Sequence, residues 1–71
     1  MDYGTQVRVM RAVRGKTQIE LADIIGISNK QLGWIENNRM LPTPDLAAAI
    51  REALAWPDNA DEAFALLETA N

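Results

Sequence analysis

Apolar side chains recur every three or four residues along nearly the whole chain, and no stretch alternates long enough to predict a β-strand. This spacing is typical of amphipathic helices, whose buried stripe repeats with a period of about 3.6 residues. Short segments with glycine, asparagine or proline interrupt it four times. We therefore expect an all-α fold, a compact bundle of about five short helices.

Residues that favour helix ends set the expected boundaries. Gly15 follows the first helix, because glycine tolerates the left-handed conformation in which helices often end. Thr43 is the expected N-cap of the fourth helix, with Pro44 at its first position, where a missing N–H costs nothing. Asp58 is the expected N-cap of the fifth. The expected helices cover about residues 5–14, 17–25, 28–37, 44–54 and 58–69.

Residues 17–39, TQIELADIIGISNKQLGWIENNR, contain two helix starts eleven residues apart. Thr17 with Glu20 forms the sequence pattern of a capping box, and so does Ser28 with Gln31. In this pattern each side chain satisfies a backbone N–H of the other residue. The stretch therefore predicts two short helices joined by a tight turn.

Only certain residue types fit the tight turn between these two helices. A turn of three or four residues makes the helices cross steeply, which requires a small side chain at the crossing and a residue that tolerates positive φ. Ala22 and Gly26 meet these requirements. Residues 17–37 thus fit a helix-turn-helix, whose second helix can enter a DNA major groove. A helical hairpin without DNA binding fits the same spacing, so spacing alone leaves both interpretations open.

The composition excludes most enzymatic chemistry. The 71-residue chain has no cysteine and no histidine, which removes thiolate nucleophiles, imidazole acids and bases, and the common zinc ligand sets. The acidic segment 58–62 lacks the glycine and the distal glutamate of a calcium-binding loop, and a capped helix start explains it better. We therefore expect no enzyme activity, no metal site and no cofactor.

Length and hydropathy predict one small domain. Seventy-one residues allow one small core, so we expect a single domain over residues 1–71. No apolar run exceeds five residues, too short for a signal-peptide core or a membrane span. We expect a cytoplasmic protein that does not bind membranes.

The net charge of −3 conceals an uneven distribution. Residues 1–44 carry six basic and four acidic side chains, whereas residues 45–71 carry one basic and six acidic ones. Because counterions are released phosphate by phosphate, DNA binding depends on local positive charge. The first part can therefore bind DNA while the acidic part points away, although ordinary solvated surfaces would also account for these charges.

Residues 4–56 resemble the lambda-repressor-like (Cro/cI, or xenobiotic-response-element) helix-turn-helix domains. The resemblance extends over a whole pattern at fixed offsets: a first glycine, a helix with Val7, Met10 and Arg11, then Gly15, TQIELA, GIS, QLGWIEN, an arginine, a proline, DL and a closing Ala-Leu. It implies a bundle of four or five helices that binds operator DNA, usually as a two-fold dimer.

Three residues depart from the family pattern. Asn38 replaces the usual glycine, and both accept the left-handed conformation. Gly33 stands in mid-helix where serine is common, at a cost of about 1 kcal/mol relative to alanine. Lys16 replaces an apolar residue, so one core contact is expected to be missing.

Asn29, Lys30 and Trp34 of the third helix face away from its apolar side. By resemblance, the first two are base-reading positions. Asn29 can bind N6 and N7 of adenine, and Lys30 can donate to O6 and N7 of guanine. Trp34 fits two places, either on a thymine methyl or sugar, or over the joint between the third and fourth helices.

The resemblance also implies contacts with DNA phosphates. Gln18, in the first turn of the second helix, would bind a phosphate and support the third helix. Asn37 and Arg39 follow the third helix and are further candidates, although Arg39 also fits an ordinary solvated charge. Gln31 is a candidate only if its capping box leaves the amide available.

One ion pair is implied within the protein. The resemblance pairs Arg11 of the first helix with Glu36 at the end of the third, and the pair would fix how the reading helix is presented. Because loss of one partner leaves an uncompensated charge, we assign this pair to stability.

Two functions fit these features. The first is a sequence-specific, repressor-type regulator that binds double-stranded DNA as a homodimer, with the two-fold contact made by helix 58–69 or around Trp56. In this helix, the apolar residues expected to make that contact are Phe64, Leu66 and Leu67. The second is an antitoxin or anti-repressor adaptor, whose acidic C-terminal part binds a protein partner.

Overall fold

The computed structural model describes residues 1–69, with side chains described as far as Leu66. Within this range the chain forms five helices and no strand. They are α1 (Tyr3–Val13), α2 (Gln18–Ile25), α3 (Asn29–Glu36), α4 (Pro44–Ala53) and α5 (Ala60–Thr69). The all-α fold expected from the apolar spacing is confirmed.

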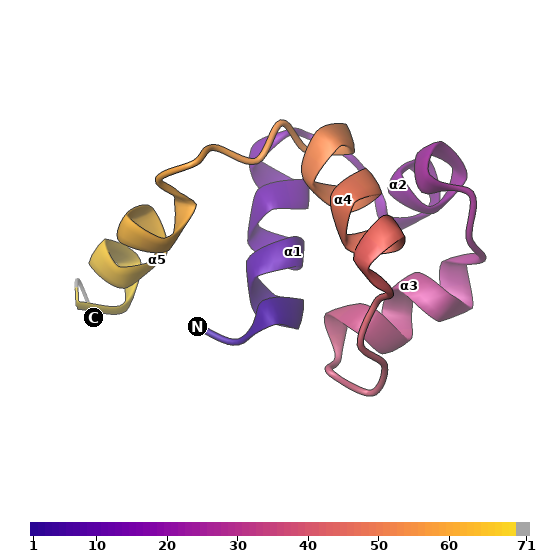
Figure 1. The fold of residues 1–71 in the computed structure, drawn as a ribbon, viewed down its shortest axis with the longest axis horizontal. Coiled ribbons are helices and arrows are strands. Elements are labelled where there is room, and N and C mark those ends of the chain that lie inside the picture. The colour runs from indigo at the N-terminus through magenta and orange to yellow at the C-terminus, as the bar shows by residue number, and fades with distance from the viewer. Residues whose placement is uncertain (70–71) are drawn as a thin grey trace.

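The first four helices form a close cluster, and α5 lies beyond α1 on the side away from α2 and α3 (Figure 1). α3 packs against α1 and α2, and α4 packs against α2. Every helix contributes to one buried core, with Met40 and other half-buried side chains packed around it. The core residues are Val7, Met10, Leu21, Ala22, Leu32, Ile35, Ile50, Leu54, Ala60 and Phe64.

The helix ends follow the local sequence at most positions. Both capping boxes form, at Thr17 and at Ser28, with each cap and its N3 residue exchanging hydrogen bonds. Thr43 caps α4, whose first residue is Pro44. Gly15 and Gly26 have positive φ, at 67° and 78°, as expected at helix ends.

Two expected helix starts are wrong. α1 begins at Tyr3 rather than Thr5, because the Asp2 carboxylate accepts the Thr5 N–H at 2.8 Å and caps the helix two residues earlier. α5 begins at Ala60, so Asp58 lies before the capping position. The Asn59 carbonyl accepts the N–H groups of Glu62 and Ala63 in its first turn.

Two residues other than glycine take positive φ after a helix. Asn38 has φ 60° after α3, as expected, and Ala55 has φ 47° after α4. Both ends show the paired hydrogen bonds of a Schellman motif, such as Trp56 N–H to the Arg51 carbonyl at 2.9 Å. Arg14 strengthens the second end, because its guanidinium donates to the carbonyls of Leu54 and Ala55, at 2.7 and 2.8 Å.

Aromatic contacts attach α5 to the rest of the protein. The Tyr3 and Trp56 rings stack with centroids 6.3 Å apart, and the Trp56 and Phe64 rings meet at 5.8 Å. Phe64 is 4% exposed, so it belongs to the core and is not available for the expected dimer contact. Leu66 is 70% exposed, whereas the side chain of Leu67 lies outside the described residues. No helix in residues 1–69 is long and apolar enough to cross a membrane.

Candidate nucleic-acid interface

Backbone hydrogen bonds stabilise the turn between α2 and α3. The N–H groups of Gly26 and Ile27 both donate to the Ala22 carbonyl, at 2.9 and 3.0 Å. Ala22 is 2% exposed, which agrees with the need for a small side chain where the helices meet. Leu21 of α2 and Leu32 of α3 are fully buried in the common core. The two helices therefore form one rigid unit.

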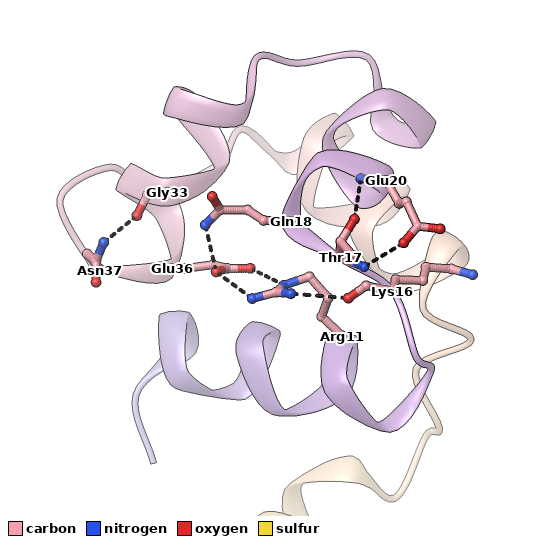
Figure 2. A network of polar contacts seen from close by, with 8 residues as sticks. All are labelled: Arg11, Lys16, Thr17, Gln18, Glu20, Gly33, Glu36 and Asn37. Carbon is pink, nitrogen blue, oxygen red and sulfur yellow. Dashed lines mark hydrogen bonds and ion pairs between the residues drawn. The ribbon is translucent and has the colours of Figure 1, made fainter.

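A buried polar network fixes the far end of α3. Glu36 is 2% exposed, and Arg11 Nε donates to its Oε2 at 2.8 Å, while Nη2 donates to Oε1 at 3.3 Å. Gln18 Nε2 donates to the same Oε1 at 3.0 Å. Arg11 Nη1 also donates to the Lys16 carbonyl, at 3.1 Å. Figure 2 shows Glu36 approached from both sides, by Arg11 of α1 and Gln18 of α2.

This network defines the surroundings of Gln18. The residue lies in the first turn of α2, and its side chain points to Glu36 rather than out to solvent (Figure 2). It is half-buried. One of its two amide hydrogens is used by Glu36, so the other remains for a ligand at the start of α2.

The start of α3 is open to solvent. Asn29 and Lys30 are exposed. The Gln31 side-chain carbonyl accepts the Ser28 N–H at 3.1 Å, so the capping box occupies its oxygen and leaves its NH2 group as a donor. Trp34 is 39% exposed, and the Lys30 Nζ lies 5.3 Å from the centroid of its ring.

Trp34 lies one turn after Lys30 on α3, and part of its side chain is exposed. Its contact with a thymine methyl or sugar stays a prediction. Asn29, Lys30 and Trp34 are thus brought together on one exposed stretch of this helix.

The loop after α3 contains the other two phosphate candidates. Asn37 is exposed, and its Nδ2 donates back to the Gly33 carbonyl at 2.9 Å (Figure 2). Arg39 is exposed, and its backbone N–H donates to the Trp34 carbonyl at 2.8 Å.

Sequence reasoning missed the role of Asn38. Its Oδ1 accepts the Gly4 N–H at 3.0 Å, and its Nδ2 donates to the Asp2 carboxylate at 2.9 Å. These bonds tie the loop after α3 to the first turn of α1. The signal in the sequence was an asparagine at a position where glycine is usual. Because asparagine tolerates the left-handed conformation of the turn, the backbone alone explained its presence.

Comparisons with known proteins agree with this geometry. A family model described as helix-turn-helix matches residues 7–55, which include α2, its turn and α3. The chain belongs to the lambda-repressor-like helix-turn-helix family. It is a DNA-binding transcriptional regulator.

One solved structure is similar to this helix-turn-helix protein over nearly its whole length. It is the clp gene regulator ClgR from Corynebacterium glutamicum, with a TM-score of 0.77 and 27% sequence identity. The similarity covers 96% of this chain and 78% of that one, so it extends past the family match. A search of curated proteins gave no match.

Hydrogen bonds lower the pKa of two carboxylates of this helix-turn-helix protein, the N-cap Asp2 and the N3 residue Glu20 of the first capping box. The Thr5 N–H, followed by the Asn38 amide, lowers the pKa of Asp2 to about 2. The Thr17 N–H lowers the pKa of Glu20 below its usual value. In residues 1–69 no group of three acidic side chains is placed to hold a metal ion.

Proposed function

We propose that this protein is a repressor-type regulator that reads operator DNA with the first turns of α3 in the major groove. The observation that carries this proposal is the contrast along α3, whose start exposes Asn29 and Lys30 while Glu36 at its end is buried. A helix held at its end can present its N-terminal residues to base edges in a fixed orientation.

The base-reading roles follow from side-chain chemistry. Asn29 offers an amide that can pair with N6 and N7 of adenine, and Lys30 offers an ammonium group for O6 and N7 of guanine. Trp34 supplies an apolar surface beside them. All three are exposed on α3.

Four residues are proposed as phosphate contacts. Gln18 and Gln31 each keep amide hydrogens at the start of a helix, where the backbone dipole favours an anion. Asn37 and Arg39 extend the contact surface past the end of α3. Such contacts set the position of the protein on the duplex and supply affinity without reading the sequence.

A two-fold dimer in the cytoplasm completes the proposal. α5 lies on the side of α1 away from α3, so a dimer made there leaves both reading helices accessible (Figure 1). Its exposed apolar residues among the described side chains are Ala63, Ala65 and Leu66. To occupy major grooves one helical turn apart, the dimer must hold its two α3 helices about 34 Å apart.

Selection of bound duplexes from a random DNA library tests this function. Affinity for the recovered sequences is then measured from 50 to 200 mM salt, where about a thousandfold weakening or more is expected for six or more phosphate contacts. A two-fold motif with half-sites one helical turn apart supports the proposal. Weak binding without an enriched motif contradicts it and favours a protein partner for the acidic C-terminal part.

A further inference from the structure

Lys30 and Trp34 form a pair on the exposed face of α3. They are four residues apart, which places their side chains one above the other on a helix. The Lys30 Nζ lies over the Trp34 ring, 5.3 Å from its centroid. A cation this close to an indole face is attracted by the negative charge of the π-system.

The surroundings leave Lys30 no comparable alternative. Glu36 is the only acidic residue of α3, and it is buried against Arg11. Within the described residues no carboxylate forms an ion pair with Lys30. Within the described residues, the indole ring is therefore the group that the structure places against the ammonium of Lys30.

Ordering matters because a lysine is a flexible point charge. Its four-carbon stem loses rotamer freedom when the ammonium binds a partner, and this loss reduces both affinity and discrimination. The ring contacts the cation through its face and accepts none of its three N–H donors in the way that an oxygen would. A lysine held over Trp34 can thus bind two acceptors and lose less side-chain conformational entropy when it does so.

We propose that Trp34 is a positioning residue, which holds Lys30 for recognition of a guanine in each half-site through its O6 and N7 acceptors. This inference rests on the proposed DNA-binding function and adds how the lysine is held for its guanine. It also assigns Trp34 a role through Lys30, in place of a direct base contact.

The first experiment compares motifs selected by four full-length proteins: wild type, Lys30→Ala, Trp34→Phe and Trp34→Leu. Phenylalanine keeps an aromatic face, and leucine is the matched control that keeps apolar bulk without one. Because Trp34 is 39% exposed, all four are expected to fold, and thermal melting monitored by circular dichroism verifies this.

The wild type is expected to select a guanine that Lys30→Ala no longer prefers, with a loss of about 5- to 150-fold on that site. Trp34→Leu is expected to lower preference for the same guanine by about 2- to 30-fold, and Trp34→Phe to retain most of it. In the double variant Lys30→Ala/Trp34→Leu the two losses should not add, because both act on one contact.

The second experiment replaces that guanine by 7-deazaguanine, which lacks the N7 acceptor. Wild type and Trp34→Phe are expected to bind the modified duplex more weakly than the parent duplex. Lys30→Ala should bind both duplexes equally.

The outcomes separate this inference from the function beneath it. If the wild type selects no motif, the proposed function fails and this inference fails with it. If it selects a motif whose guanine preference survives unchanged in Trp34→Leu, only the positioning role is overturned. Uniform weakening of Lys30→Ala on all sequences, with a salt dependence smaller by about one charge, would make Lys30 a phosphate contact and overturn the guanine assignment.

Discussion

The two ends of α3 differ in how firmly they are held. At its start, Asn29 and Lys30 are exposed, and within the described residues the ammonium group of Lys30 lies over the Trp34 ring. At its end, Glu36 is 2% exposed and accepts hydrogen bonds from both Arg11 and Gln18. One helix of eight residues thus combines an open end with a fixed one.

This difference separates the residues proposed to read DNA from those that hold the helix in place. Substitutions at the exposed start remove no core contact, so they can change sequence preference while the fold persists. Substitutions at the buried end remove partners of a charged network and should act on stability first. Variants at the start of α3 should therefore change DNA sequence preference, and variants at its end should change stability.

Glu36→Ala is expected to have the largest effect on stability. It leaves the Arg11 guanidinium, 21% exposed, without its carboxylate and removes the acceptor of Gln18. Loss of one partner of a buried pair typically costs about 3 to 5 kcal/mol. Urea denaturation measures this loss, while the affinity of the remaining folded fraction for DNA should change much less. Melting like that of the wild type would contradict the assignment.

Two variants serve as controls for Glu36→Ala. Lys30→Ala, at the other end of the helix, should alter the free energy of unfolding by no more than about 0.5 kcal/mol. The double variant Arg11→Met/Glu36→Leu replaces both charges by apolar side chains, and should recover much of the stability lost by removing one charge alone.

Gly4→Ala tests how closely α1 approaches the fixed end of α3. A Cβ at Gly4 would collide with backbone carbonyl groups of Glu36 and Ile35, lying 2.7 Å from the Ile35 oxygen. Because a backbone cannot rotate away as a side chain can, α1 must shift, at a cost of about 1 to 3 kcal/mol.

Gly33→Ala is the matched control within α3. A Cβ there would lie 3.7 Å from Gln18 Nε2, an ordinary contact distance. Alanine should therefore raise the free energy of unfolding by up to about 1 kcal/mol through its higher helix propensity. Equal destabilisation by the two glycine variants in urea denaturation would show that the close approach of α1 to α3 is unimportant.

Asn38→Gly and Ala55→Gly are expected to have opposite effects on stability, although both residues have a left-handed backbone. Glycine relieves strain at both, but at Asn38 it also removes the acceptor of the Gly4 N–H. Ala55→Gly should stabilise by about 1 kcal/mol. Asn38→Gly should destabilise by up to about 1 kcal/mol, because a buried donor loses its partner. Thermal melting of both variants checks the opposite signs.

The sequence predicts the features that depend on neighbouring residues. Both capping boxes and the glycine after α1 are local, since each involves residues a few positions apart. The expected start of α1 was wrong, also for a local reason. Asp2 and Thr5 are both good N-caps, and spacing does not tell which one accepts the hydrogen bond.

Contacts between distant residues could not be predicted in this way. Asn38 lies 36 residues from Asp2, and Arg14 lies 40 residues from Leu54. Such pairs meet only after the helices have packed, and the apolar pattern contains no information on which polar side chains then face each other. For the residues proposed to contact DNA, the sequence indicated their exposure and their chemistry, while the contact of Lys30 with Trp34 became visible only in the structure.

Acid should weaken the link between the fixed end of α3 and α1, with the smallest effect of this series. The pKa of Asp2 is about 2 in the folded protein, because the Thr5 N–H and the Asn38 amide stabilise its charged form. An unfolded aspartate has a pKa of about 3.9. The carboxylate therefore contributes stability that is fully present above about pH 4 and is lost as the pH falls through about 2.

Asp2→Asn isolates this contribution, because its side-chain oxygen can still accept both hydrogen bonds but does not titrate. The free energy of unfolding is measured for both proteins between pH 2 and 5. The wild type should lose more stability than the variant as the pH falls. In an Asn38→Gly background this difference should become smaller but persist, because the Thr5 N–H still donates to Asp2. Identical pH profiles for wild type and Asp2→Asn would mean that the cap of α1 does not depend on the charge of Asp2.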